Sequence, residues 1–263
     1  MGKAMKLGFI GTGEITAAMV TGLCSSGDGH SIRLSPRNYT IAESLAHRFS
    51  TVTIASSNQD VLDDSETVVI AMRPQVVREV LSELRFRPEH QVVSVVSSFP
   101  WQAIAELVAP ARRLTRAVPL PSTAKRLSPT AIYPPNHAIE DLFALLGAVY
   151  PVETEDEFDA VCAVTATIAT YFAFANTTST WLVRNGISEA SARDYVARMM
   201  LGFTSAAVDA PEVGFQSLAR EHATAGGINE QFLNHFLAAG LLEKVAHGLD
   251  AVKQRITVAS KTP

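Results

Sequence analysis

Cysteine is almost absent from this sequence of 263 residues, which contains only two. Cys24 and Cys162 lie far apart and outside any C-x-x-C spacing, so the sequence indicates neither a zinc site nor a redox pair. Clusters of basic residues are also missing, and 22 Lys and Arg against 26 Asp and Glu give a net charge of −4. A nucleic-acid surface needs a basic stripe, so this balance argues against nucleic-acid partners.

Only one stretch lacks charge over a length that could cross a bilayer, namely residues 160–183. It contains many hydroxyl and amide side chains, among them Thr170 and Asn176, so we expect a buried helix rather than a membrane span. The apolar surface of such a helix must be buried against other protein, which a second subunit would supply. The first residues enter an apolar run without a signal-peptide pattern, so we expect a cytoplasmic protein.

The chain is long enough for one large or two modest domains, and 47% hydrophobic with 18% charged residues is typical of a globular protein. Short β-branched runs predict strands at Lys6–Ile10, Ile32–Ser35, Val52–Ile54, Thr67–Ala71, Val92–Ser97, Leu114–Val118, Ala131–Tyr133 and Val149–Val152. Helical spacing between them, at Ile15–Ser25, Ile41–Phe49, Val76–Leu84 and Trp101–Val108, favours a parallel α/β sheet.

The second part of the chain has no strand signals. It predicts helices over about Phe158–Leu182, Ser188–Val208 and Asn229–Ile256. We therefore expect an α/β domain over residues 1–154 and an all-helical domain over residues 155–263.

The most informative motif follows the first predicted strand. Gly11, Thr12, Gly13, Glu14 and Ile15 lead from that strand into a helix, which is the context in which a G-x-G-x-x-G pattern indicates dinucleotide binding. Gly11 permits the tight turn, and Gly13 lets a pyrophosphate approach the N–H groups of the helix N-terminus. The third glycine is replaced by Thr16, whose side chain either loosens the helix packing or caps the local backbone.

The end of the second predicted strand bears on the choice of dinucleotide. NAD-binding folds usually carry a carboxylate there, whereas an arginine accommodates the 2′-phosphate of NADP. This chain has Ser35, Arg37 and Asn38 and no carboxylate, so the sequence favours NADP(H) over NAD(H). The alternative is that Arg37 is a solvated loop residue.

Several motifs together resemble the Δ1-pyrroline-5-carboxylate reductase family. The resemblance lies in the Gly8–Gly13 segment, in Ala71, Met72, Arg73 and Pro74, in Arg116–Pro119, and in the Gly226-Gly227 pair. Arg73 stands where the family usually has lysine. The resemblance implies a Rossmann domain that binds NAD(P)H, a helical dimerisation domain, a homodimer or larger homo-oligomer, and reduction of a cyclic imine, as in proline biosynthesis.

The chain departs from the family where the substrate is expected. The family's S-P-G-G-T-T loop is replaced by Thr224–Asn229, and its G-S-G-P-A-Y segment falls near Thr170. The resemblance implies substrate contacts from Thr170, Thr224, Gly226, Gly227 and Asn229. We therefore expect an imine reductase of altered specificity.

Candidates for the proton transfer and hydrogen bonding of imine reduction are His222 and Asn229. A structural role for His222 is an equal alternative. No spacing of His or carboxylates predicts a metal, and Glu153–Glu157 is interpreted as a solvated helix start. Two other functions stay open: an NADP-dependent dehydrogenase of a C=O or C–OH substrate, and a catalytically silent NADP-binding regulator.

Overall fold

The computed structural model describes residues 4–259, which form two compact units. One unit contains the chain up to Cys162 and the last part from Lys253 onward, and the other contains Ala163–Val252. The boundary that we predict after Thr154 falls at the start of the helix α7 (Glu155–Thr165) and stays a prediction. The first two turns of this helix lie with the sheet unit.

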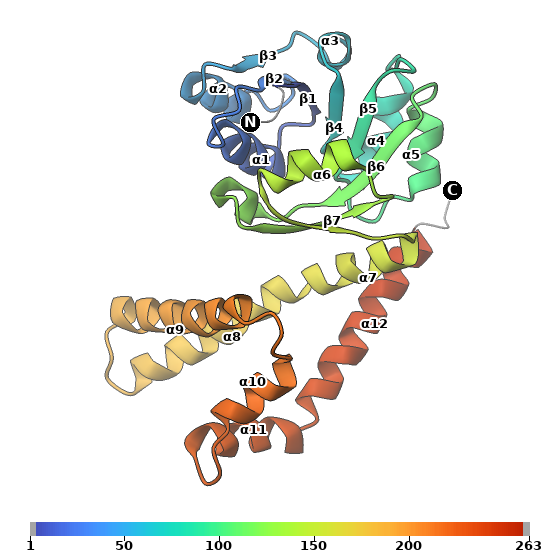
Figure 1. Cartoon of the computed structure of the whole chain (residues 1–263). Helices are drawn as coiled ribbons and strands as arrows, with labels where there is room; N and C mark the ends of the chain where they lie inside the picture. Colours follow the sequence, from blue (N-terminus) through green and yellow to red (C-terminus); the bar gives the residue numbers. More distant parts are fainter. Residues whose placement is uncertain (1–3, 260–263) are drawn as a thin grey trace. The chain divides into compact units, whose positions relative to one another are not determined.

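The first unit is built on one eight-stranded sheet with the order β3-β2-β1-β4-β5-β6-β7-β8 (Figure 1). Its strands are β1 (Lys6–Ile10), β2 (Ser31–Leu34), β3 (Val52–Ile54), β4 (Thr67–Ile70), β5 (Gln91–Ser94), β6 (Arg113–Val118), β7 (Ser128–Tyr133) and β8 (Gly147–Pro151). All eight predicted strands are present, and β1 to β6 are parallel.

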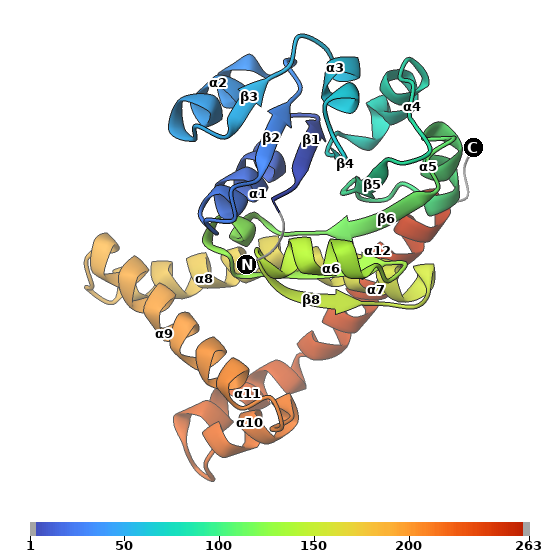
Figure 2. The same cartoon turned by 45° about the horizontal axis from the view of Figure 1, so that its top comes forward.

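The parallel sheet that we expect has an exception at β7, which pairs antiparallel with β6. The link between these strands holds only the 3-10 helix η1 (Pro121–Lys125). It is shorter than the dozen or so residues that a parallel crossover needs, so the chain must reverse. Figure 2 shows β8 beside the helix α6 (His137–Ala144) at this end of the sheet, where β8 is again parallel to β7.

Two hydrophobic cores lie on the two faces of the sheet because neighbouring strand residues point in opposite directions. Val69 and Val93 join the core under α1 (Glu14–Cys24), α2 (Tyr39–Arg48) and α6, while Val68 and Val92 join the core on the other face. That second face is covered by α3 (Asn58–Asp63), α4 (Pro74–Ser82) and α5 (Trp101–Leu107). The strand order and helices on both faces are those of a doubly wound Rossmann fold.

The second unit contains only helices among its described residues: the end of α7, α8 (Thr167–Arg184), α9 (Glu189–Asp209), α10 (Phe215–His222), α11 (Ile228–Ala238) and most of α12 (Leu241–Ala259). The prediction of one helix over Asn229–Ile256 is wrong, because Gly240 adopts a φ of +63° and separates α11 from α12. The predicted helix over Phe158–Leu182 is likewise divided, at Ala166.

The helix α8, whose one charged residue is Arg184 at its end, has no buried residue within this chain. Phe172 and Trp181 are 65% and 60% exposed. By length and composition, Glu155–Arg184 could cross a membrane, a test that core helices of globular proteins also pass. The expectation of a buried helix is therefore not met within the described residues, and its cover by a second subunit stays a prediction.

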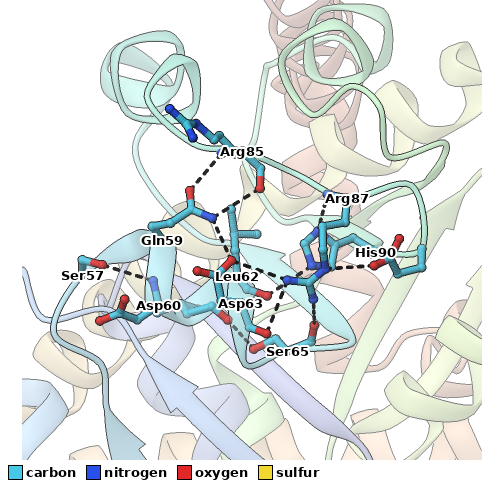
Figure 3. Close-up of polar contacts among 11 residues, drawn as sticks. Ser57, Gln59, Asp60, Leu62, Asp63, Ser65, Arg85, Arg87 and His90 are labelled. Atoms are coloured by element: carbon cyan, nitrogen blue, oxygen red, sulfur yellow. Dashed lines mark hydrogen bonds and ion pairs between the residues drawn. The ribbon is translucent and has the colours of Figure 1, made fainter.

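A polar network lies at the opposite edge of the sheet from the glycine turn, where β4 and β5 begin (Figure 3). His90 is fully buried there; its Nδ1 accepts a hydrogen bond from the Arg87 N–H, so its Nε2 carries the proton and donates to the Leu62 carbonyl. Burial and the Arg87 charge hold the pKa of His90 below its usual value. The Arg87 side chain in turn contacts Asp63 and Glu89. This network connects α3 to the start of β5, and we interpret it as part of what holds the fold together rather than as a functional site.

Candidate functional site

The glycine turn after β1 has the geometry that the motif requires. Gly11 adopts a φ of +99°, and a Cβ there would lie 2.2 Å from the Ala71 carbonyl oxygen, so only glycine fits. Gly13 is the N-cap of α1 without a side-chain cap, and a Cβ at this position would meet no described atom within 4 Å. Among the described residues no side chain caps this helix N-terminus, and the space beside Gly13 is open, which suits a pyrophosphate.

Three hydroxyl groups form hydrogen bonds with the backbone around this turn. The Gly11 N–H donates to Ser35 Oγ at 2.9 Å, and Thr12 Oγ1 donates to the Ser35 carbonyl at 2.8 Å. Thr16, which replaces the third glycine, is fully buried and donates its hydroxyl to the Gly11 carbonyl at 2.7 Å. Of the two alternatives for Thr16, the structure supports the cap. Ser35 is 1% exposed, and its hydrogen bonds are made to residues of the turn. It therefore stabilises the shape of the site from the protein interior.

Most of the remaining predicted cofactor residues follow β2 and β4, on either side of the turn. Arg37 is exposed and makes no hydrogen bond or ion pair within residues 4–259, and Asn38 is the N-cap of α2. Arg73 is the N-cap of α4, and Pro74 is its first residue. Glu14 is exposed in the first turn of α1. Because β1, β2 and β4 are parallel neighbours, their carboxyl ends place these residues along one edge.

In the helical unit, the predicted substrate residues Thr224, Gly226 and Gly227 lie in the loop that leads into α11, and Asn229 is the second residue of that helix. Gly226 has a φ of +73°, and a Cβ at Gly227 would meet Thr224 Oγ1 at 2.7 Å, so both glycines are needed for the turn. The Gly227 N–H donates to the Thr224 carbonyl at 2.8 Å. Asn229 is exposed in the first turn of α11.

Two predicted residues lie outside this loop. Thr170 lines a mostly apolar groove of the helical unit with Phe174, Leu241 and Val245, and no hydrogen bond within residues 4–259 joins it to the loop. His222 ends α10, where its Nδ1 lies 2.8 Å from the Leu218 carbonyl oxygen. This contact with the backbone of its own helix is a structural role for His222. A role for His222 in proton transfer stays a prediction.

The structure also contains a buried charge cluster that we did not predict from the sequence. Arg116 on β6 is fully buried, and its Nη1 lies 2.6 Å from Glu155 Oε1 and 3.4 Å from Asp159 Oδ1, both on α7. Its guanidinium also stacks 4.5 Å from the ring centre of Phe158. The interpretation of Glu153–Glu157 as a solvated helix start is therefore wrong at Glu155, which also accepts the Trp101 N–H.

A capping box accounts for the rest of that acidic run. Glu157 accepts the N–H groups of Glu153 and Thr154, and Thr154 Oγ1 accepts the Glu157 N–H. These bonds lower the pKa of the Glu157 carboxyl. Within residues 4–259, no three His, Cys, Asp or Glu side chains lie together as a metal site.

Comparison with known proteins finds two family models that match parts of this chain. Residues 6–112 match the family model described as NADP oxidoreductase, coenzyme F420-dependent, and residues 155–258 match pyrroline-5-carboxylate reductase dimerisation. The pyrroline-5-carboxylate reductase of Pseudomonas aeruginosa is 24% identical over 95% of both chains.

Solved structures show the same fold. The 1-pyrroline-5-carboxylate reductase of Streptococcus pyogenes aligns with a TM-score of 0.83 and 24% identity, over 99% of this chain and 100% of that chain. The pyrroline carboxylate reductase of Plasmodium falciparum, solved with NADP bound, aligns with a TM-score of 0.82 and 17% identity over the same shares.

Proposed function

We propose that this chain is a member of the pyrroline-5-carboxylate reductase family and that it reduces the C=N bond of a cyclic imine with NADPH. It is an NAD(P)H-dependent oxidoreductase with a Rossmann domain. The observation that carries the proposal is the glycine turn, in which Gly11 is held against Ala71 while the helix N-terminus at Gly13 is open. The residues present therefore fit a dinucleotide.

The chemistry requires a hydride and a proton. A bound reduced nicotinamide supplies the hydride to the imine carbon, the π electrons of the C=N bond move to nitrogen, and nitrogen takes up a proton. The chain must orient the imine and stabilise its protonated form. We assign the orientation of the imine to Thr170 and to the loop of Thr224, Gly226, Gly227 and Asn229. We assign the donation of the proton to His222 and hydrogen bonding to Asn229.

Consumption of NADPH, followed by the loss of nicotinamide absorbance, tests this function against a panel of cyclic imines and 2-oxo acids. Turnover of an imine but not of the 2-oxo acids supports an imine reductase. Turnover of the oxo acids alone favours the dehydrogenase, and tight NADPH binding without turnover of either class favours the silent regulator.

Arg37 is proposed to select NADPH over NADH. Its exposed guanidinium follows β2, where the 2′-phosphate of NADP lies in this fold. We expect Arg37→Ala to weaken NADPH binding by about ten- to a hundredfold, since a hydrogen bond to a charged group contributes roughly 1.5–3 kcal/mol. NADH binding should change little. Equilibrium titration of both cofactors measures the effect.

The matched control is Arg112→Ala, which removes another exposed arginine of the same unit, just before the amino end of β6. It should leave both dissociation constants unchanged. Equal affinity of the parent protein for NADPH and NADH would contradict the assignment of Arg37.

We also propose that the protein is a homodimer or a larger homo-oligomer in the cytoplasm. The support is the match of residues 155–258 to a dimerisation family, together with exposed apolar side chains on the same helices. They include Phe172, Trp181, Leu201, Phe203 and Phe232, each more than half exposed. Surface of this kind marks an interaction site. Sedimentation at micromolar concentration should give a mass of at least twice 28.2 kDa; a monomer would refute the proposal.

A further inference from the structure

The loop that leads into α11 is closed by a carboxylate of its own helix. Glu230, the third residue of α11, accepts the Gly226 N–H at Oε2 over 2.8 Å. The neighbouring Gly227 N–H donates to the Thr224 carbonyl, also at 2.8 Å. Both glycine N–H groups, which could otherwise hold an anionic group of a ligand, are therefore already paired inside the loop.

The charge of Glu230 has a second consequence for any ligand at this loop. The partial positive charge of a helix N-terminus favours a nearby anion, and in this chain the Glu230 carboxylate already occupies that place. A ligand carboxylate that comes to the same turn meets a like charge and must compete for the Gly226 N–H. The protonated imine, by contrast, is a cation, and a nearby carboxylate attracts it.

We infer that Glu230 determines substrate class, directing the enzyme to cyclic imines that carry no carboxylate beside the C=N bond. This inference rests on the proposed imine reduction and on the placement of the substrate at the Thr224–Asn229 loop. Ile228 fits the same preference, because it is 83% exposed in the first turn of α11 and offers an apolar contact. Glu230 acts here on recognition, with no part in the transfer of the hydride or the proton.

Two imines with the same ring test the inference: 1-pyrroline and 1-pyrroline-5-carboxylate. In the parent protein, kcat/KM for 1-pyrroline should exceed that for the carboxylate by at least about tenfold. Glu230→Gln keeps an oxygen that can accept the Gly226 N–H but removes the charge. In this variant, the ratio of kcat/KM for 1-pyrroline to kcat/KM for the carboxylate should fall about tenfold, chiefly through a lower KM for the carboxylate.

Glu243→Gln is the matched control, because Glu243 is also the third residue of its helix, α12, and follows a glycine of positive φ, Gly240. This control should leave the ratio unchanged. Arg220→Ala tests whether the arginine in the last turn of α10 provides a separate carboxylate contact. A large loss of carboxylate turnover in Arg220→Ala would overturn the inference.

The same preference should appear without turnover. With NADP present, pyrrolidine should raise the melting temperature more than proline does in the parent protein, and Glu230→Gln should reduce that difference. A parent protein that prefers the carboxylate imine, or a ratio unaffected by Glu230→Gln, would overturn the inference while leaving imine reduction intact. If the folded parent protein reduces neither imine nor any other in the panel, the proposed function itself fails, and this inference fails with it.

Discussion

Replacing Gly11 by alanine is expected to weaken NADPH binding by at least about a hundredfold. A Cβ at this position would lie 2.2 Å from the Ala71 carbonyl oxygen and 2.8 Å from its carbon, and a φ of +99° is unfavourable for alanine. The turn would have to move, and the N–H groups of α1 would move with it. Loss of two hydrogen bonds to the pyrophosphate, each contributing roughly 1.5–3 kcal/mol, gives the expected size.

The same substitution should lower the free energy of unfolding by roughly 1–3 kcal/mol, the usual cost of a residue held in a disfavoured backbone conformation. Gly13→Ala separates the two effects. Gly13 has an ordinary φ of −104°, and its Cβ would meet nothing within 4 Å among the described residues.

Gly13→Ala should therefore keep the melting temperature of the parent protein but weaken NADPH binding, because the new methyl group lies where the pyrophosphate approaches. Fluorescence titration and thermal unfolding of both variants provide the comparison. A stable Gly11→Ala protein with the parent affinity would show that the turn adapts and that the assigned role of Gly11 is wrong.

The sheet could be predicted from the sequence because each of its strands is a short buried run with its own local pattern. A run such as Thr67–Ile70, which is buried at every residue, can be predicted as a strand from its own sequence alone. The helices α3 and α6 are not among the segments that we predict, since six and eight residues hold too little periodicity. The break at Gly240 was missed because a single glycine is tolerated within a helical pattern.

The cofactor site was more predictable than the rest of the functional surface for the same reason. Gly11, Gly13 and Thr16 lie within six consecutive residues, so their spacing alone shows the turn. Glu230 could have been noticed, because a Glu at the third position of a helix often binds back to the preceding turn. Its effect on a ligand, however, depends on the Gly226 N–H that it occupies, which only the structure shows.

Arg116 lay beyond sequence reasoning because its partners are 39 and 43 residues away along the chain. We expect Arg116→Met to lower the free energy of unfolding by about 3–5 kcal/mol, the usual result of removing one partner from a buried ion pair. Methionine can still pack on Phe158, so the loss measures chiefly the charge. Asp159, which is 4% exposed, is then left without its cation.

The stability of Arg116→Met should also depend on pH. Burial already raises the pKa of Asp159, and the Arg116 charge opposes that rise, so removing Arg116 raises the pKa further. A carboxyl whose pKa is raised in the folded state keeps its proton there after it has ionised in the unfolded chain. The stability of the variant should therefore fall as the pH rises from about 4, the ordinary pKa of aspartate, through the raised value.

Thermal and urea unfolding at several pH values test both parts. Arg113→Met is the matched control, because Arg113 lies on the same strand but is exposed, and this variant should remain close to the parent protein. Adding Asp159→Asn to Arg116→Met should restore part of the lost stability by removing the unpaired carboxylate. An Arg116→Met protein as stable as Arg113→Met at neutral pH would show that the sheet and α7 are held together by their apolar contacts alone.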